Sequence, residues 1–306
     1  MILAGQLDVG PLQWTVQVPD GGVVRYSDPA YAGFWRNADH NSEAACTPLV
    51  RLPVTITRQA LQIPASEPLY CGGKNWAIWS DDSHLIICSG FHQQSAARFH
   101  CRLSRDFSHA DVALDPAREG VDGKIYDGPL RYPIDQILSW GMLSRCGGMI
   151  LHASVAVKDG AGWVFAGRSG AGKSTMSSLC HAEGWKILND DRVMLYQRNG
   201  KTMVAGTPWH GSGRFAEAME VPLGGIYFLK QAVEDRVEII DSAQARLSLL
   251  DIAAIPWFED DWSGNTLQTV DSFTKSIPFH RFHFTKSPSA VRAIEMHQHQ
   301  NMSVAR

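Results

Sequence analysis

The chain has 306 residues, of which 44% are hydrophobic and 19% charged, and its formal net charge is −3. This composition supports a sizeable core and excludes wholesale disorder, and the small negative charge gives no electrostatic reason to expect nucleic acid or an anionic membrane as the main partner. The length is comfortable for two domains.

The six cysteines include no Cys-x-x-Cys pair and no zinc-finger spacing to histidine. The first residues lack the basic segment and apolar run of an export signal, and no stretch approaches the ~20 apolar residues of a membrane span. The sequence therefore predicts a cytoplasmic protein with reduced cysteines and with neither membrane nor nucleic acid as partner. A homo-oligomer is left open.

The first 128 residues predict a β-rich N-terminal domain. Short alternating or β-branched runs are separated by turn residues, and no helical stripe stands out. The expected strands are 12–18, 49–57, 75–80, 84–91 and 97–104, followed by a polar linker at 116–132. The role of this domain, residues 1–128, is not indicated.

Residues 129–306 predict a second domain, in which helices and strands alternate. Apolar residues recur at helical spacing from Ile134, with Gly147-Gly148 as the stop, and further helices are expected at 173–183, 242–253 and 288–296. The expected strands are 149–157, 162–167, 185–189, 192–197, 201–205, 224–230, 236–240 and 279–285. This alternation is typical of the α/β class.

A phosphate-binding loop is predicted between the strand at 162–167 and the helix at 173–183. The segment reads Gly167, Arg168, Ser169, Gly170, Ala171, Gly172, Lys173, Ser174 and Thr175. Its glycines allow consecutive backbone N–H groups to surround phosphate oxygens, and the positive end of the following helix adds to that field. Lys173 supplies a cation for the outer phosphates, and Ser174 offers a hydroxyl to Mg²⁺. We therefore expect ATP, or another nucleoside di- or triphosphate, together with Mg²⁺ as cofactors.

Asp190 and Asp191 end a strand sixteen residues after Ser174. One short helix fits between them, so this strand is expected to return beside the strand that precedes the phosphate loop. Neighbouring side chains at a strand end point to opposite sides. One carboxylate can then hold Mg²⁺ while the other accepts the proton of an incoming hydroxyl, and we expect Asp191 nearer the metal and Asp190 nearer the acceptor.

His152 lies in the apolar strand 149–157. On its own, a histidine in a strand is more often a hydrogen-bonded core residue than a catalytic one. A hairpin formed by strands 149–157 and 162–167 would bring it level with the end of the phosphate loop.

The run from Leu151 to Leu195 resembles the catalytic core of the HPr kinase/phosphorylase superfamily. The shared features are a His-Ala-Ser strand, the phosphate loop with Ser-Gly-x-Gly-Lys-Ser, and a strand that ends in Asp-Asp. The likeness is clear over about 130–240 and weak over 241–296.

This resemblance implies an α/β P-loop kinase core like that of HPr kinase and phosphoenolpyruvate carboxykinase, and phosphorylation of a serine hydroxyl. It implies that Lys173 and Ser174 handle phosphates and Mg²⁺, that Asp190 and Asp191 share metal binding and base catalysis, and that His152 lies near the transferred group.

The sequence departs from the bacterial HPr kinases downstream of Asp191. Their Arg-Gly-Leu-Gly signature is absent, and residues 204–229 read VAGTPWHGSGRFAEAMEVPLGGIYFL instead. This disfavours HPr as the substrate. The better resemblance is to HPr-kinase-related proteins, which include peptide-tailoring kinases and a free-serine kinase.

Several other residues carry weaker predictions. In the turn-rich segment 206–214, Trp209 and Arg214 are candidates for a substrate-binding rim. His280 and His283 should lie on opposite faces of one strand, which disfavours a shared metal. Residues 297–306 are expected to fray, and Trp257, Phe258 and Trp262 to pack beneath a loop.

Two functions follow from these residues. The first is an ATP-dependent kinase acting on a hydroxyl-bearing peptide, protein or metabolite. The alternative is a non-catalytic nucleotide-binding switch with the same phosphate loop.

Overall fold

The computed structural model describes residues 1–38, 47–57, 64–72, 76–89, 99–114 and 124–304, apart from the side chains of residues 99 and 299–304. The fold is mixed α/β with several sheets, and the chain divides into two compact units, Met1–Met142 and Leu143–Arg306. In the described ranges, no helix is long and apolar enough to cross a membrane.

The first unit is built on a nine-stranded sheet, with the strand order β4-β1-β2-β5-β10-β9-β8-β7-β6. A separate parallel pair joins β11 to β3, and helix α1 (Ile134–Ser144) reaches the end of the unit. The strands are β1 (Ile2–Val9), β2 (Leu12–Val18), β3 (Val23–Arg25), β4 (Trp35–Asn37), β5 (Val50–Thr57), β6 (Tyr70–Gly72), β7 (Trp76–Ser80), β8 (His84–Ser89), β9 (Phe99–Ser104), β10 (Ala110–Leu114) and β11 (Ile125–Asp127).

This unit differs from the expectation in two places. No strand is predicted before residue 12, but β1 pairs with β2 in an antiparallel hairpin and buries every second side chain along its second half. The described part of the expected linker is not a linker, because β11 pairs with β3 and Tyr126 is fully buried. Tyr31 also donates a 2.6 Å hydrogen bond to Asp135 of α1. The first unit therefore extends beyond the expected boundary at residue 128 and ends at Met142.

Parts of the expected elements lie outside the described residues. These are residue 75 of the strand at 75–80, residues 90 and 91 of 84–91, residues 97 and 98 of 97–104, and residues 116–123 of the linker.

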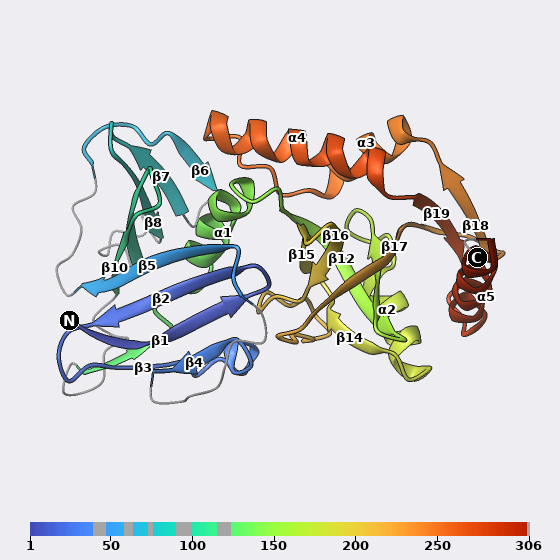
Figure 1. Ribbon diagram of the computed structural model, residues 1–306, viewed down its shortest axis with the longest axis horizontal. Coiled ribbons are helices and arrows are strands. Elements are labelled where there is room, and N and C mark those ends of the chain that lie inside the picture. The colour runs from blue at the N-terminus through green and yellow to red at the C-terminus, as the bar shows by residue number, and fades with distance from the viewer. Residues whose placement is uncertain (39–46, 58–63, 73–75, 90–98, 115–123, 305–306) are drawn as a thin grey trace. The chain divides into compact units, whose positions relative to one another are not determined.

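The second unit contains both strands and helices (Figure 1). Its strands are β12 (Met149–Lys158), β13 (Ala161–Ala166), β14 (Lys186–Asn189), β15 (Arg192–Arg198), β16 (Lys201–Ala205), β17 (Glu220–Gln231), β18 (Arg236–Ile240) and β19 (Phe279–Phe284). Its helices are α2 (Lys173–Ala182), α3 (Ser242–Ile252), α4 (Asp260–Ser276) and α5 (Ser289–Val304). These elements do not alternate as expected, because the strands β14 to β18 follow one another directly and helices α3 and α4 come after them.

Two long strands, β12 and β17, each belong to two sheets. One sheet runs in the order β14-β12-β13-β17-β19-β18, and in the other β15 and β16 connect β12 to β17. The expected hairpin of β12 and β13 is confirmed. The expectation for the Asp-Asp strand is wrong in one respect, because β14 pairs with β12 and not with β13. The strand that carries His152 therefore lies between the phosphate loop strand and the aspartate strand.

Helices cover both faces of the larger sheet, and the alternation of side chains along its strands explains why. Along β13, Val164 and Ala166 pack with buried residues of α3 and α4, whereas Phe165 packs with buried residues of α2 and α5. Strand β17 alternates in the same way, with Phe228 facing one layer and Tyr227 the other. A strand buried on both faces is what a central strand between two helical layers requires.

Two helices correct the predictions for the last part of the chain. Trp262, expected beneath a loop, lies in the first turn of α4 and is buried, while Trp257 before it is exposed. The tail expected to fray continues α5 to Val304. There His297 contacts His280 and Tyr227, whereas His283 lies near Glu238.

Candidate functional site

The phosphate loop follows β13 and opens helix α2, and its glycines have conformations that other residues rarely adopt. Gly170 and Gly172 have φ angles of 82° and 110°. A Cβ on Gly172 would also lie 2.4 Å from Cζ of Phe284, at the end of β19. The backbone therefore needs glycine at 172 both for its dihedral angle and for its close approach to a buried ring.

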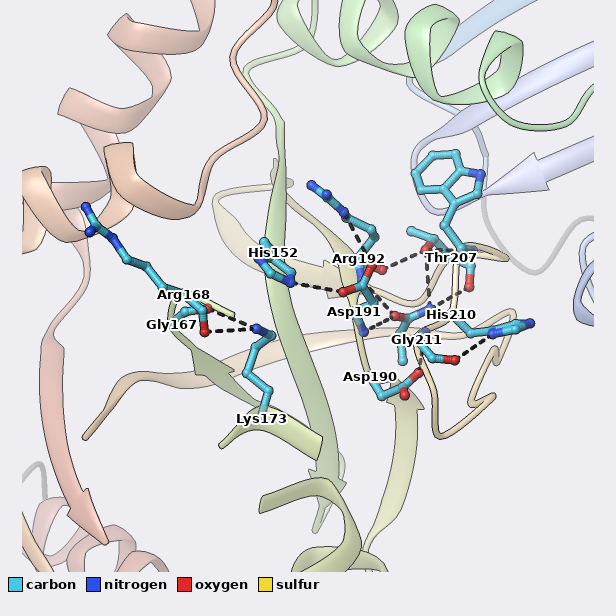
Figure 2. A network of polar contacts seen from close by, with 12 residues as sticks. His152, Gly167, Arg168, Lys173, Asp190, Asp191, Arg192, Thr207, His210 and Gly211 are labelled. Carbon is cyan, nitrogen blue, oxygen red and sulfur yellow. Dashed lines mark hydrogen bonds and ion pairs between the residues drawn. The ribbon is translucent and has the colours of Figure 1, made fainter. Parts of the chain in front are cut away.

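Lys173 is the first residue of α2 and lies almost entirely within the protein. Its Nζ donates to the carbonyl oxygen of Gly167 at 3.0 Å, as Figure 2 shows. Burial lowers the pKa of Lys173, and the charge of Asp191 opposes this shift. Gly172 supplies no side-chain cap to the helix, so the first N–H groups of α2 add their partial positive charge to that of the ammonium group. This arrangement favours an anion at the mouth of the loop.

His152 and Asp191 form a pair beside this loop (Figure 2). In the β12–β13 ladder Ala153 lies opposite Ala166, so the register places His152 at the level of Gly167. Nε2 of His152 lies 3.0 Å from Oδ1 of Asp191, and both side chains are about one-third exposed, at 27% and 34%. The hydrogen bond from His152, with the nearby charges of Arg192 and Lys173, lowers the pKa of Asp191 against the opposing effect of burial. Asp191 is therefore an ionised carboxylate within reach of a ligand.

Asp190 lies in a different environment from its neighbour. It is buried, and its two oxygens accept backbone hydrogen bonds from Gly211 at 2.8 Å and Gly213 at 2.6 Å. A Cβ on Gly213 would lie 2.7 Å from Oδ2 of Asp190, so this carboxylate packs directly on glycine backbone. Asp190 therefore holds the 211–213 turn through one backbone hydrogen bond to each of its carboxylate oxygens.

Asn189 fixes the turn that carries both aspartates. Its Oδ1 accepts the N–H groups of Asp191 at 2.7 Å and Arg192 at 2.8 Å, and its Nδ2 donates to the carbonyl of Thr207 at 2.8 Å. Thr207 in turn donates to the carbonyl of Arg192 at 2.6 Å. These bonds hold the aspartate turn against the 206–213 segment.

A pocket of about 410 Å³ brings most of the predicted site residues together. Its lining residues are His152, Ser169, Gly170, Gly172, Lys173, Ser174, Thr175, Asp190, Asp191, Gly211, Ser212, Gln231 and Lys286. The phosphate loop, the histidine and both aspartates thus face one cavity, although they come from separate stretches of sequence.

Some predicted residues lie elsewhere. The guanidinium of Arg168 points away from the pocket and donates two hydrogen bonds of 2.6 Å to Asp251 of α3. Gly167 and Ala171 belong to the loop but do not line the cavity. Of the two rim candidates, Trp209 is buried and Arg214 is exposed with a φ of 57°, and neither lines the pocket.

Gln231 and Lys286 line the pocket and are not predicted from the sequence. Gln231 is the last residue of β17 and Lys286 is the second residue after β19, and both strands are parallel to β13. The carboxyl ends of parallel strands share one edge of a sheet, where ligands bind in α/β proteins. The sequence signal that could have identified them is a polar residue directly after each of the expected strands 224–230 and 279–285.

The residues fit a nucleotide-bound Mg²⁺ better than a metal held by the protein alone. Within the described residues, no three His, Cys, Asp or Glu side chains gather closely enough to hold a metal. Mg²⁺ is usually held by one or two protein oxygens together with substrate phosphates and water. Ser174 and Asp191 line the same pocket and offer such oxygens.

Comparisons with known proteins extend these observations. The sequence profile of a family described as "SynChlorMet cassette protein ScmC" matches residues 137–282. Among solved structures, the Hpr(Ser) kinase/phosphatase from Coxiella burnetii matches 51% of this chain and 99% of its own, with 14% sequence identity and a TM-score of 0.30. A search of curated proteins finds no match. At this TM-score the structural likeness carries no functional conclusion.

Proposed function

We propose that this protein is an ATP-dependent kinase that transfers a phosphoryl group to a serine-type hydroxyl of a peptide, a protein or a small metabolite. The observation that carries the proposal is the pocket itself. Lys173 and Ser174 of the phosphate loop line the same cavity as the His152–Asp191 pair. A kinase needs both a phosphate cradle and a proton acceptor beside it.

The phosphate loop binds the nucleotide. Backbone N–H groups at the start of α2 and the ammonium of Lys173 stabilise the negative charge of the outer phosphates. Ser174, which lines the pocket, would hold Mg²⁺ together with those phosphates. The ion would neutralise phosphate charge when bound.

We assign the proton-accepting role to Asp191 in place of Asp190. Asp190 is buried, and a backbone N–H group on each of its oxygens holds the carboxylate on the 211–213 turn. Asp191 is about one-third exposed, with Oδ1 3.0 Å from Nε2 of His152 and Oδ2 3.5 Å from Nε of Arg192, and these two contacts orient the carboxylate toward the pocket that it lines. In the reaction the acceptor oxygen forms a bond to the γ-phosphorus, the bond from that phosphorus to the β-phosphate oxygen breaks, and the hydroxyl proton moves to Asp191. ADP and the phosphorylated acceptor are the products.

The proposal is tested by incubating the protein with γ-labelled ATP, Mg²⁺ and a panel of hydroxyl acceptors that includes serine-containing peptides and free serine. Labelled acceptor that depends on both Mg²⁺ and Lys173 is the expected result. Saturable Mg²⁺–ATP binding without transfer to any acceptor would support the nucleotide-binding switch instead. If the folded protein neither binds Mg²⁺–ATP nor transfers phosphate, both proposed functions are ruled out.

The role of Asp191 has its own test. As the base, Asp191→Asn should keep Mg²⁺–ATP affinity within about threefold but slow phosphoryl transfer by roughly 10²–10⁴, the usual scale of general base catalysis. Calorimetry and a transfer assay on the same preparation separate these effects. A large loss of affinity in the presence of Mg²⁺, with little loss in EDTA, would make Asp191 a metal ligand.

A further inference from the structure

Gln231 and Lys286 lie at the end of the pocket opposite to His152 and Asp191. In the larger sheet the strand order is β14-β12-β13-β17-β19, and β13, β17 and β19 run parallel. The residues at this edge therefore follow in the order Asp191, His152, phosphate loop, Gln231, Lys286, and all of them border one cavity. The pocket has an acidic end and a basic end, with the phosphate loop between them.

The basic end is built against the phosphate loop. Nε2 of Gln231 donates to the carbonyl oxygen of Gly170 at 2.9 Å. Phe284, the last residue of β19, is fully buried and lies under Gly172. The two strands that carry Gln231 and Lys286 thus contact the loop directly, so their distance from it is fixed by packing.

The turn that carries Lys286 is also held in place. Oδ1 of Asp235 accepts the N–H of Thr285 at 2.6 Å, and its Oδ2 accepts the hydroxyl of Ser289. These residues flank Lys286 on both sides. The backbone of Lys286 is therefore anchored, while its side chain is exposed and lines the pocket.

We propose that Lys286 binds the phosphates of the nucleotide that are not transferred, so that the nucleotide lies across the loop with its γ-phosphate toward Asp191. This assignment rests on the proposed kinase function. Two carboxylates at one end repel a polyphosphate that carries no metal there, whereas a cation at the other end attracts it. Lys286 is suited to this contact, because its anchored backbone keeps an exposed cationic side chain at the pocket wall beside the loop.

The experiment measures nucleotide affinity in the full chain by calorimetry with Mg²⁺, using ATP and ADP as separate ligands. Lys286→Met removes the charge and keeps the length of the side chain, and Lys286→Arg restores a cation. Lys275→Met, an exposed lysine of α4 away from the pocket, is the matched control. We expect Lys286→Met to weaken ATP and ADP alike by about three- to tenfold, since exposed ion pairs are partly screened. We expect Lys286→Arg to recover most of the affinity and Lys275→Met to change it less than twofold.

Each outcome bears on the assignment. A loss confined to ATP would place Lys286 at the γ-phosphate and overturn the proposed orientation. Unchanged affinity for both nucleotides in Lys286→Met, while Lys173→Met loses binding, would overturn the role of Lys286 and leave the kinase proposal intact. Wild-type affinity in Lys173→Met as well would instead count against the kinase function.

Discussion

Two glycine-rich segments border the pocket, and they use their backbone N–H groups in opposite ways. In the segment that contains Gly211 and Gly213, two N–H groups donate to the protein's own carboxylate, Asp190. In the phosphate loop, Gly172 leads into α2 without a side-chain cap, and the ammonium group of Lys173 donates to the loop's own carbonyl at Gly167. We call the first segment closed, because a carboxylate of the protein already accepts its N–H groups. We call the second segment open, because no side chain caps the start of α2 and an anionic ligand could bind there.

This contrast shows that glycine content alone does not identify a ligand-binding loop. Glycine allows an oxygen atom to approach the backbone closely, as the carboxylate of Asp190 does at Gly211 and Gly213. The difference is whether a carboxylate of the chain already occupies that position. Asp190 lies in the turn of the 211–213 segment much as a phosphate would lie on the phosphate loop, which is why we treat Asp190 as structural and Asp191 as reactive.

Replacing Lys173 should have the largest effect on nucleotide affinity, and it tests whether the phosphate loop is the segment that binds an external anion. Lys173→Met removes charge-assisted hydrogen bonds to phosphate, each worth about 1.5–3 kcal/mol, so we expect nucleotide affinity to fall about a hundredfold. Burial lowers the pKa of Lys173 and thus already disfavours its charge, so the thermal midpoint should not fall. Calorimetry and thermal unfolding of one preparation provide both values. A variant that folds and binds normally would contradict the contrast between the two segments.

A second test compares two glycines within the phosphate loop. Gly170→Ala introduces only strain at positive φ, because nothing lies within 4 Å of the added Cβ. We expect it to lower the free energy of unfolding by about 1–2 kcal/mol. Gly172→Ala adds the collision with Phe284 and should cost about twice as much. Phe284→Leu in the Gly172→Ala background should recover part of the loss. Equal costs for both glycines in denaturant titrations would argue against the close packing of β19 beneath the loop.

Replacing Asp190 tests the closed segment. Asp190→Asn turns one acceptor into a donor opposite a backbone N–H of Gly211 or Gly213, so the free energy of unfolding should fall by about 1–3 kcal/mol. Nucleotide affinity should stay within about threefold. Asp191→Asn is the control, because a carboxylate that is about one-third exposed should affect stability far less. If Asp190→Asn unfolded like the wild type yet lost nucleotide binding, Asp190 would belong to the ligand site.

The smallest effect is expected at Arg168, which is part of the phosphate loop sequence but points to Asp251. Arg168→Ala should change nucleotide affinity less than about twofold, because an exposed ion pair contributes little. A loss comparable to that of Lys173→Met would mean that Arg168 turns toward the phosphates when a nucleotide binds.

Local sequence patterns predict the phosphate loop, helix α2 and the position of His152, because each depends on residues adjacent in the chain or joined by one hairpin. Gln231 and Lys286 are not predicted, because parallel pairing of β13 with β17 and of β17 with β19 brings them to the loop from far along the chain. Helix α4 is missed for a different reason. Its buried face includes Thr266, Thr269 and Thr274, so the apolar stripe that indicates a helix is interrupted by polar residues.

The position of His152 within β12 has a consequence for how the sequence of this site can change. In β12 the residue pairs with Arg192 of β15, while the next residue, Ala153, pairs with Ala166 of β13. His152 thus lies where the strand passes from one sheet to the other. Deleting or inserting one residue there would reverse inward and outward side chains in one of the two ladders. The site should therefore not tolerate a change in the length of this strand at His152.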